Sequence, residues 1–296
     1  MAGKWRNAEP NQNSAEALAI AHERGLVELP APSTQGTTPS GHIEPQWLML
    51  DANPLPHRLE EFAKTFICEQ GFRPQYLALE NSGYEVVSEL PAEISNKEGA
   101  VIFAGRSRKA NEVEFARAWS IVREGGTIIM AGEKTAGIAS LRKWVARRVG
   151  VDGSFSKHHA QLFWVKRSNQ VWPAEIVTKP DDGYVIAPGM FSADGPDPGS
   201  QLLADQFDNA ISGDVADFGA GWGYLGTELL KRCDNIKALD SYEAHWPSLV
   251  AAEENMKQPG TGTVTGFHWI DLTTEVVNRS YDWIVMNPPF HVSRAS

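Results

Sequence analysis

A strand, a glycine-rich turn and a helix follow one another between residues 213 and 233, and this unit limits the possible folds more strongly than any other stretch. The segment reads GDVADFGAGWGYLGTELLKRC, with Gly219, Gly221 and Gly223 at alternate positions. Glycines in such a turn allow positive φ and let a ligand approach without meeting a Cβ atom. Tyr224 stands where a dinucleotide-binding turn would carry its third glycine. The spacing therefore disfavours a dinucleotide, and a purely structural turn is the alternative to a ligand site.

The residues after this turn predict further alternation of strands and helices. A strand is expected at residues 235–244, a helix at 245–256 and another strand at 263–271. A fourth strand, at 281–286, must stop at Asn287 because Pro288 and Pro289 have no N–H with which to continue a ladder. Such alternation implies a mainly parallel sheet, whose ligands bind at the carboxyl ends of the strands. Asn287 should therefore lie at the same edge as the glycine turn.

A similar α/β pattern occupies the first half of the chain. Three strands are expected at residues 99–105, 125–132 and 160–166, and two helices at 111–124 and 138–148. This half has no glycine-rich turn between a strand and a helix, since Gly105 stands alone at the end of its strand. We therefore expect no nucleotide there.

Segments rich in proline, glycine and small polar residues divide the chain. A helix at 14–24 is followed by such a segment at 30–46, and a second one spans 179–201. We predict an N-terminal helix and linker, a first α/β domain and a second α/β domain, at residues 1–46, 47–178 and 179–296.

Charge is distributed unevenly along the chain. The net charge is −10, yet residues 101–170 contain 13 Lys and Arg against 5 Asp and Glu. That local excess of +8 leaves −18 for the remainder. Such asymmetry can mark a nucleic-acid surface, and the alternative is an ordinary solvated face of mixed helices.

Composition also bears on location. No apolar run approaches the roughly 20 residues needed to cross a bilayer, and the polar start MAGKWRNAEPNQNS has no signal-peptide core. The two cysteines, Cys68 and Cys233, provide neither a disulfide framework nor a metal cluster. We expect a cytoplasmic protein without a membrane partner or a bound metal.

The glycine turn, with Asp217 before it in VADFG, resembles motif I of the class I S-adenosylmethionine-dependent methyltransferases. The resemblance implies S-adenosyl-L-methionine as the cofactor, with its amino-acid portion lying against the turn. It also implies that the cofactor is bound by Asp217, Gly219, Ala220, Gly221 and Gly223.

Acids at later strand ends extend this predicted cofactor site. A carboxylate that ends the second strand can accept both ribose hydroxyls. Glu243, 12 residues before Asn255, matches the interval usual in the family, and Asp240 is the alternative. Asp271 ends the third strand, where the family places an acid near the adenine amino group. The alternative for Asp271 is the N-cap of a following helix.

The segment NPPF at 287–290 resembles motif IV of methyltransferases that modify a planar, conjugated nitrogen. An exocyclic amine on a base is a poor nucleophile because its lone pair is delocalised into the ring. Acceptors at the Asn287 side chain and the Pro288 carbonyl would favour a pyramidal nitrogen whose lone pair points at the methyl group. Phe290 would stack on a flipped base, and Pro289 would help to fix the loop. We assign Asn287, Pro288, Pro289 and Phe290 as catalytic, and Asn287 also as cofactor-binding.

The combination resembles the ribosomal RNA guanine-N2 methyltransferases of the RsmC and RlmG type. PGMFSADGPDPGSQLL at 188–203 looks like the family segment that precedes motif I. The resemblance implies two tandem Rossmann-like class I methyltransferase domains, of which the first is degenerate and aids RNA binding. It further implies methyl transfer to the N2 amine of a guanine in small-subunit (16S) ribosomal RNA, by a monomer that contacts the RNA or the small subunit.

The chain departs from that family at its carboxyl end. Comparison with the first half suggests that roughly 60 residues, comprising a fifth to a seventh strand, are missing after the fourth strand. The second domain is therefore expected to be truncated. Other acceptors remain open, namely an adenine N6 or a protein glutamine. A non-catalytic RNA-binding or assembly protein is a further alternative, and a nicotinamide oxidoreductase is disfavoured by Tyr224.

Overall fold

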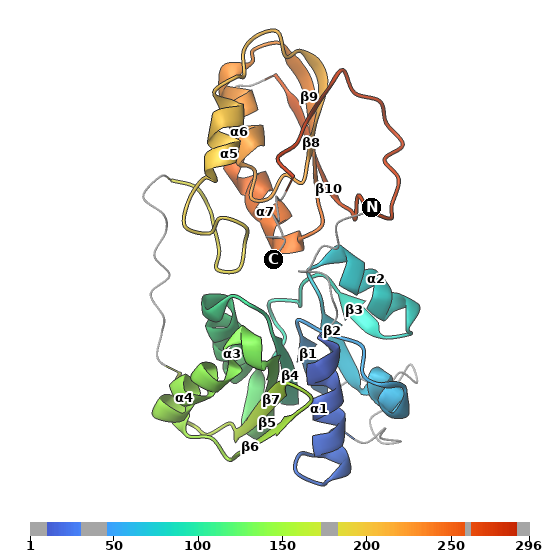
Figure 1. Cartoon of the computed structure of the whole chain (residues 1–296), viewed down its shortest axis with the longest axis vertical. Coiled ribbons are helices and arrows are strands. Elements are labelled where there is room, and N and C mark those ends of the chain that lie inside the picture. Colours follow the sequence, from blue (N-terminus) through green and yellow to red (C-terminus); the bar gives the residue numbers. More distant parts are fainter. Residues whose placement is uncertain (1–10, 31–45, 173–182, 258–261, 289–296) are drawn as a thin grey trace, which may run out of the picture. The chain divides into compact units, whose positions relative to one another are not determined.

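The computed structural model describes residues 11–30, 46–172, 183–257 and 262–288 (Figure 1). The chain divides into two compact units, Met1–Ile176 and Val177–Ser296, and each is described by itself. Pro289 and Phe290, two of the four residues predicted to be catalytic, lie outside the described residues.

The first unit is built on a seven-stranded sheet with the order β3-β2-β1-β4-β5-β7-β6. The strands from β3 to β5 in this order are parallel, whereas β7 pairs antiparallel with both β5 and β6. Their bounds are β1 Trp47–Leu50, β2 Phe66–Glu69, β3 Glu85–Val87, β4 Lys97–Ala104, β5 Val122–Glu133, β6 Gly153–Lys157 and β7 Ala160–Lys166.

Helices cover both faces of this sheet (Figure 1). They are α1 Gln12–Glu23, α2 Arg73–Asn81, α3 Arg108–Ile121 and α4 Ile138–Val149, with 3-10 turns at His57–Thr65 and Lys134–Ala136. Leu18 of α1 lies in one core cluster, while Phe115 of α3 and Leu141 of α4 lie in the other. The N-terminal helix, which the sequence placed outside the first α/β domain, thus supplies part of that domain's core.

The predicted helices and strands of the first unit are all present, except that residues 122–124, predicted to end the helix at 111–124, belong to β5. Several short elements were not predicted. β1 is a four-residue buried run, WLML, which periodicity cannot tell from a buried helical segment. β2, β3 and β6 are also short, and α2 has a single buried residue, Leu79. Such elements depend on pairing with distant residues, which a local pattern does not contain.

The second unit contains four parallel strands in the order β10-β9-β8-β11. They are β8 Gly213–Phe218, β9 Ile236–Glu243, β10 Val264–Trp269 and β11 Trp283–Val285. Three helices, α5 Pro198–Ala204, α6 Tyr224–Arg232 and α7 Trp246–Asn255, lie on one side of this sheet (Figure 1). The predicted parallel α/β arrangement is confirmed.

The two units share one arrangement of strands. In chain order, the second unit places its third, second, first and fourth strands side by side, and the first unit places β3, β2, β1 and β4 in the same order. This repetition supports the prediction of tandem domains, which remains a prediction.

None of the described helices combines the length and the apolar character that a membrane span requires.

Gly99 on β4 offers a test of packing in the first unit. It pairs with Trp47 of β1, and a Cβ atom at position 99 would lie 2.5 Å from the buried indole ring. Gly99→Ala must therefore displace the ring, and we expect it to lower the free energy of unfolding by about 1–3 kcal/mol. Gly105→Ala is the matched control, since a Cβ there meets nothing within 4 Å. Urea denaturation of both variants decides, and equal stability would contradict this packing.

Candidate functional site

The turn after β8 presents bare backbone at the carboxyl edge of the second sheet. Gly219, Gly221 and Gly223 have φ of 77°, 56° and 88°, a region that side chains rarely adopt. A Cβ at Gly219 or Gly221 would meet no atom of the described residues within 4 Å, whereas one at Gly223 would lie 2.8 Å from the Cα of Ala252. The first two glycines therefore leave open surface, and the third allows α6 to pack on α7. Ala220 between them is buried.

Asp217, directly before this turn, is a buried acid to which the described residues provide no hydrogen-bond partner. Its side chain is fully buried, and neither carboxylate oxygen is paired with any group that the structure describes. Burial raises the pKa of Asp217 to about 7, and the negative charge of Glu243 adds to the rise. The Gly226 amide opposes the shift in part, although it lies outside hydrogen-bond geometry. A donor or a cation near this carboxylate would stabilise its charged form.

Glu243 ends β9 and is bonded to the glycine turn. Its Oε2 accepts the Gly221 N–H at 2.8 Å, and its Oε1 accepts the His245 N–H at 2.8 Å. Burial raises the pKa of Glu243, and these backbone N–H groups partly offset the rise. Because a carboxylate can accept about four hydrogen bonds, Glu243 keeps capacity for further donors such as hydroxyl groups.

Asp240, the alternative to Glu243, is occupied elsewhere. It lies within β9, and its Oδ2 accepts from Arg279 at 2.6 Å and from the Tyr281 hydroxyl at 2.6 Å. Its Oδ1 lies 3.1 Å from the His268 ring. This cluster fastens the segment before β11 to the sheet, which leaves Glu243 as the acid at the strand end.

Asp271 accepts hydrogen bonds from its own turn. Its Oδ1 binds the Thr273 N–H at 2.9 Å and the Thr273 hydroxyl at 2.6 Å, and its Oδ2 binds the Thr274 hydroxyl at 2.7 Å. Burial alone would raise the pKa of Asp271, but these hydrogen bonds outweigh it and lower the pKa. The geometry is that of a cap, although residues 272–274 form a turn instead of the helix considered above. A contact with a cofactor's adenine stays a prediction.

Asn287 lies at the same sheet edge as the glycine turn. β11 pairs with β8, with Val285 opposite Asp217, so Asn287 and Gly219 each stand two residues beyond a matched pair. Neighbouring strands run about 5 Å apart. The Asn287 Nδ2 donates to Asp197 Oδ2 at 3.0 Å and to Ser200 Oγ at 2.7 Å. Pro288 follows directly, at the end of the described residues.

Asn255 ties the turn to the segment that precedes α5. Its Oδ1 accepts the Val185 N–H at 2.6 Å, while its Nδ2 donates to the carbonyls of Val185 at 3.0 Å and Trp222 at 2.8 Å. No contact was predicted for Asn255 from the sequence, where its only signal was its position 12 residues after Glu243. The structure shows why an amide is needed there, since this side chain both accepts and donates hydrogen bonds.

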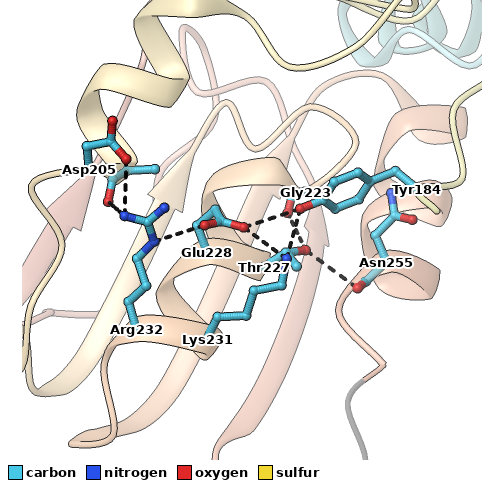
Figure 2. A network of polar contacts seen from close by, with 9 residues as sticks. Tyr184, Asp205, Gly223, Thr227, Glu228, Lys231, Arg232 and Asn255 are labelled. Carbon is cyan, nitrogen blue, oxygen red and sulfur yellow. Dashed lines mark hydrogen bonds and ion pairs between the residues drawn. The ribbon is translucent and has the colours of Figure 1, made fainter. Parts of the chain in front are cut away.

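A second polar network supports the same region from α6 (Figure 2). Glu228 accepts from Lys231 and from Arg232, both at 2.9 Å, and Arg232 continues to Asp205 at 3.2 Å. Lys231 also donates to the Tyr184 hydroxyl at 3.1 Å. Together with Asn255, this network holds the chain on either side of α5 against α6 and α7.

Comparison with known proteins identifies a related domain. Residues 184–296 match the family model described as methyltransferase small domain. Two relatives are named ribosomal RNA small subunit methyltransferase C. The protein from Pectobacterium atrosepticum is 25% identical, and the match covers 80% of this chain and 69% of the relative. The protein from Sodalis glossinidius is 32% identical, and the match covers 58% of this chain and 49% of the relative. The chain thus spans about half to two thirds of the length of these curated relatives.

A solved structure shares the fold. It is described as the T. thermophilus 16S rRNA N2 G1207 methyltransferase (RsmC) in complex with AdoMet and guanosine. The TM-score is 0.68 at 23% identity, and the match covers 83% of this chain and 71% of that one. The likeness extends across more of the chain than the second unit alone and confirms the predicted class I methyltransferase fold.

The buried Asp217 predicts a pH-dependent stability. Because its pKa in the folded chain, about 7, lies above the value near 3.9 of an unfolded aspartate, ionisation opposes folding. The stability that Asp217 contributes is therefore complete below about pH 4 and is lost as the pH rises toward 7. Asp217→Asn removes this loss, so its stability relative to the unmodified chain should rise by a few kcal/mol across that interval.

Urea denaturation at a series of pH values measures this difference. The exposed Asp234→Asn is the control, for which the difference should not follow the same course. A stability difference for Asp217→Asn that is constant with pH would contradict the raised pKa.

Proposed function

We propose that this chain, whose residues 184–296 belong to the methyltransferase small domain family, transfers a methyl group from S-adenosyl-L-methionine to the N2 amine of a guanine in 16S ribosomal RNA. The observation that carries this proposal is the pairing of β8 with β11, which places Asn287 beside the bare glycine turn. The names of the relatives, which are small-subunit ribosomal RNA methyltransferases, point to the same activity.

The residues at the turn fit this cofactor. Gly219 and Gly221 leave backbone surface where a Cβ would otherwise stand, and Glu243 can accept ribose hydroxyls beside them. The two unpartnered oxygens of Asp217 supply negative charge next to a ligand that carries an amino group and a sulfonium. When bound, S-adenosylmethionine provides an electrophilic methyl group. Asp271 is a further candidate, for the adenine amino group.

The acceptor amine is activated by hydrogen-bond acceptors at the end of β11. The Asn287 Oδ1 and the Pro288 carbonyl accept the two N–H bonds of the amine, which draws its lone pair out of conjugation. These acceptors gain strength as positive charge develops on the nitrogen, so they stabilise the transition state more than the ground state. The prolines limit the motion of the loop. Phe290 is proposed to stack on the flipped base and so to hold it beside these acceptors.

The first unit is proposed to contact RNA. Arg106, Lys109, Lys143 and Arg147 are exposed on and before α3 and on α4. Cations of this stretch also make local contacts. Arg108 and Lys109 both pair with Glu112. Arg148 lies 4.0 Å from the centre of the Trp144 ring. The exposed group supplies the charge that phosphate contacts need. We also propose that the chain acts as a monomer in the cytoplasm. The resemblance to the methyltransferases described above implies the monomer, and the composition of the chain suggests the cytoplasm.

The two candidate ribose acids can be separated by cofactor binding. Glu243→Gln replaces an acceptor-only carboxylate with an amide whose NH₂ opposes the backbone N–H groups, so cofactor affinity should fall about 10- to 100-fold. Asp240→Asn weakens the contacts to Arg279 and His268 and should lower stability while leaving affinity within about twofold. Titration calorimetry with S-adenosylhomocysteine measures both, and the reverse ranking would assign the ribose to Asp240.

Methylation of small ribosomal subunits tests the proposed function itself. The unmodified chain, supplied with labelled cofactor, should yield N2-methylguanosine on nucleoside analysis. Asn287→Ala should lower kcat at least about 100-fold, because it removes an acceptor that acts in the transition state. Any loss of cofactor affinity, from the contact that Asn287 is also predicted to make with the cofactor, should be much smaller than the loss of kcat. The exposed Asn278→Ala is the control. N6-methyladenosine or methylglutamine would reject the guanine assignment, and cofactor binding without any product would favour a non-catalytic RNA-binding role.

A further inference from the structure

The side-chain amide of Asn287 is held by two groups at the start of α5. Its Nδ2 lies 3.0 Å from Asp197 Oδ2 and 2.7 Å from Ser200 Oγ. An ionised carboxylate can accept hydrogen bonds but cannot donate them. The Asn287 atom that faces Asp197 must therefore be the NH₂ group, and chemistry alone fixes the orientation of the amide.

We propose that Asp197 is a positioning residue, which sets the Asn287 amide so that its Oδ1 is presented to the amine of the acceptor base. The inference rests on the proposed function and identifies how its main acceptor is oriented. Ser200 has a different part, because a hydroxyl both donates and accepts and so cannot select one orientation of the amide. Selection falls to the carboxylate.

Asp197 is itself fixed in place. As the N-cap of α5 it accepts the Ser200 N–H at 3.0 Å, and Pro198 follows it as the first residue of the helix. Gly199 lets the two side chains meet, because a Cβ there would lie 2.9 Å from Asp197 Oδ2 and 3.7 Å from both polar atoms of the Asn287 amide. The N-cap residue of α5 and the first residue of the loop after β11 are therefore in direct contact.

Loss of this selection has a definite chemical consequence. An amide free to turn over would present its NH₂ to the acceptor amine, so that two donors would face each other. The amine would then lose the hydrogen bond that favours its pyramidal form. Cofactor binding at the glycine turn would be unaffected, so kcat should change while cofactor affinity should not.

Asp197→Asn tests this directly. Asparagine caps a helix about as well as aspartate, yet it can pair with either orientation of the Asn287 amide. We expect kcat for methylation of small ribosomal subunits to fall about 10- to 100-fold, by analogy with other residues that orient a reacting group. Affinity for S-adenosylhomocysteine and the thermal midpoint should match the unmodified chain. Ser200→Ala, which leaves the carboxylate in place, should cost less than about fivefold.

A matched control is available in the same unit. Asp208 is an exposed acid whose Oδ1 accepts the Ala210 N–H at 2.8 Å in another turn. Asp208→Asn makes the same change of charge and preserves a similar local cap, and it should leave kcat unchanged.

Exchanging the two groups gives a sharper test. Asn287→Asp alone would set two carboxylates against each other, which is unfavourable at this distance. Adding Asp197→Asn to it restores a donor at 197 and an acceptor at 287. The same Asp197→Asn change should therefore slow the unmodified chain and speed the Asn287→Asp variant, a reversal that a purely structural role of Asp197 would not produce.

The outcomes separate the two levels of the proposal. If the unmodified chain forms no N2-methylguanosine, the proposed function fails, and this inference falls with it. If it forms the product and Asp197→Asn is as fast, the positioning role alone is overturned. Weakened cofactor affinity in Asp197→Asn, or the absence of the reversal, would equally overturn it.

Discussion

The candidate site depends on the direct pairing of β8 with β11 as parallel neighbours in the second unit. Parallel pairing brings the carboxyl ends of both strands to one edge, and the register sets Val285 opposite Asp217. Two segments almost 70 residues apart in the chain, the glycine turn and the loop that begins at Asn287, are thereby brought to neighbouring positions. Without that pairing, neither the open turn nor the anchored amide would form a site.

The first unit shows what the same strand order looks like without a glycine turn. Asn11, the N-cap of α1, donates its backbone N–H to Asn53 Oδ1 at 2.8 Å and its Nδ2 to the Ala104 carbonyl at 3.1 Å. The start of α1 thus bridges the residues that follow β1 and the end of β4. These are the positions at which the second unit has its glycine turn and Asn287. The start of α1 thus occupies these positions, in agreement with the lack of a glycine turn there, although the Asn11 Oδ1 is buried without a hydrogen-bond partner among the described residues.

Much of this architecture could be predicted from the sequence, because the glycine turn, the alternating elements and the double proline are local signals. Helices α6 and α7 and the strand-end position of Glu243 follow from them, whereas α5 begins within the segment 179–201 that was predicted to be a linker. The partners of Asp240, the turn capped by Asp271 and the contact between Asp197 and Asn287 could not be predicted. Each depends on side chains that meet only after folding, across as many as 90 residues. A pattern of residue types does not specify which groups saturate a given carboxylate.

The protonation of Asp217 would make the binding of a charged ligand at the turn depend on pH. Near neutral pH a substantial fraction of the molecules carry this proton, because its pKa is about 7. A positively charged ligand at the turn would favour the ionised carboxylate, so its binding would be accompanied by release of up to one proton to the buffer. Apparent affinity would then rise with pH until the carboxylate is fully ionised, and the measured heat of binding would vary with the ionisation enthalpy of the buffer. If such a ligand binds at the turn, this buried carboxylate, which the described residues leave without a hydrogen-bond partner, would couple its binding to the loss of a proton.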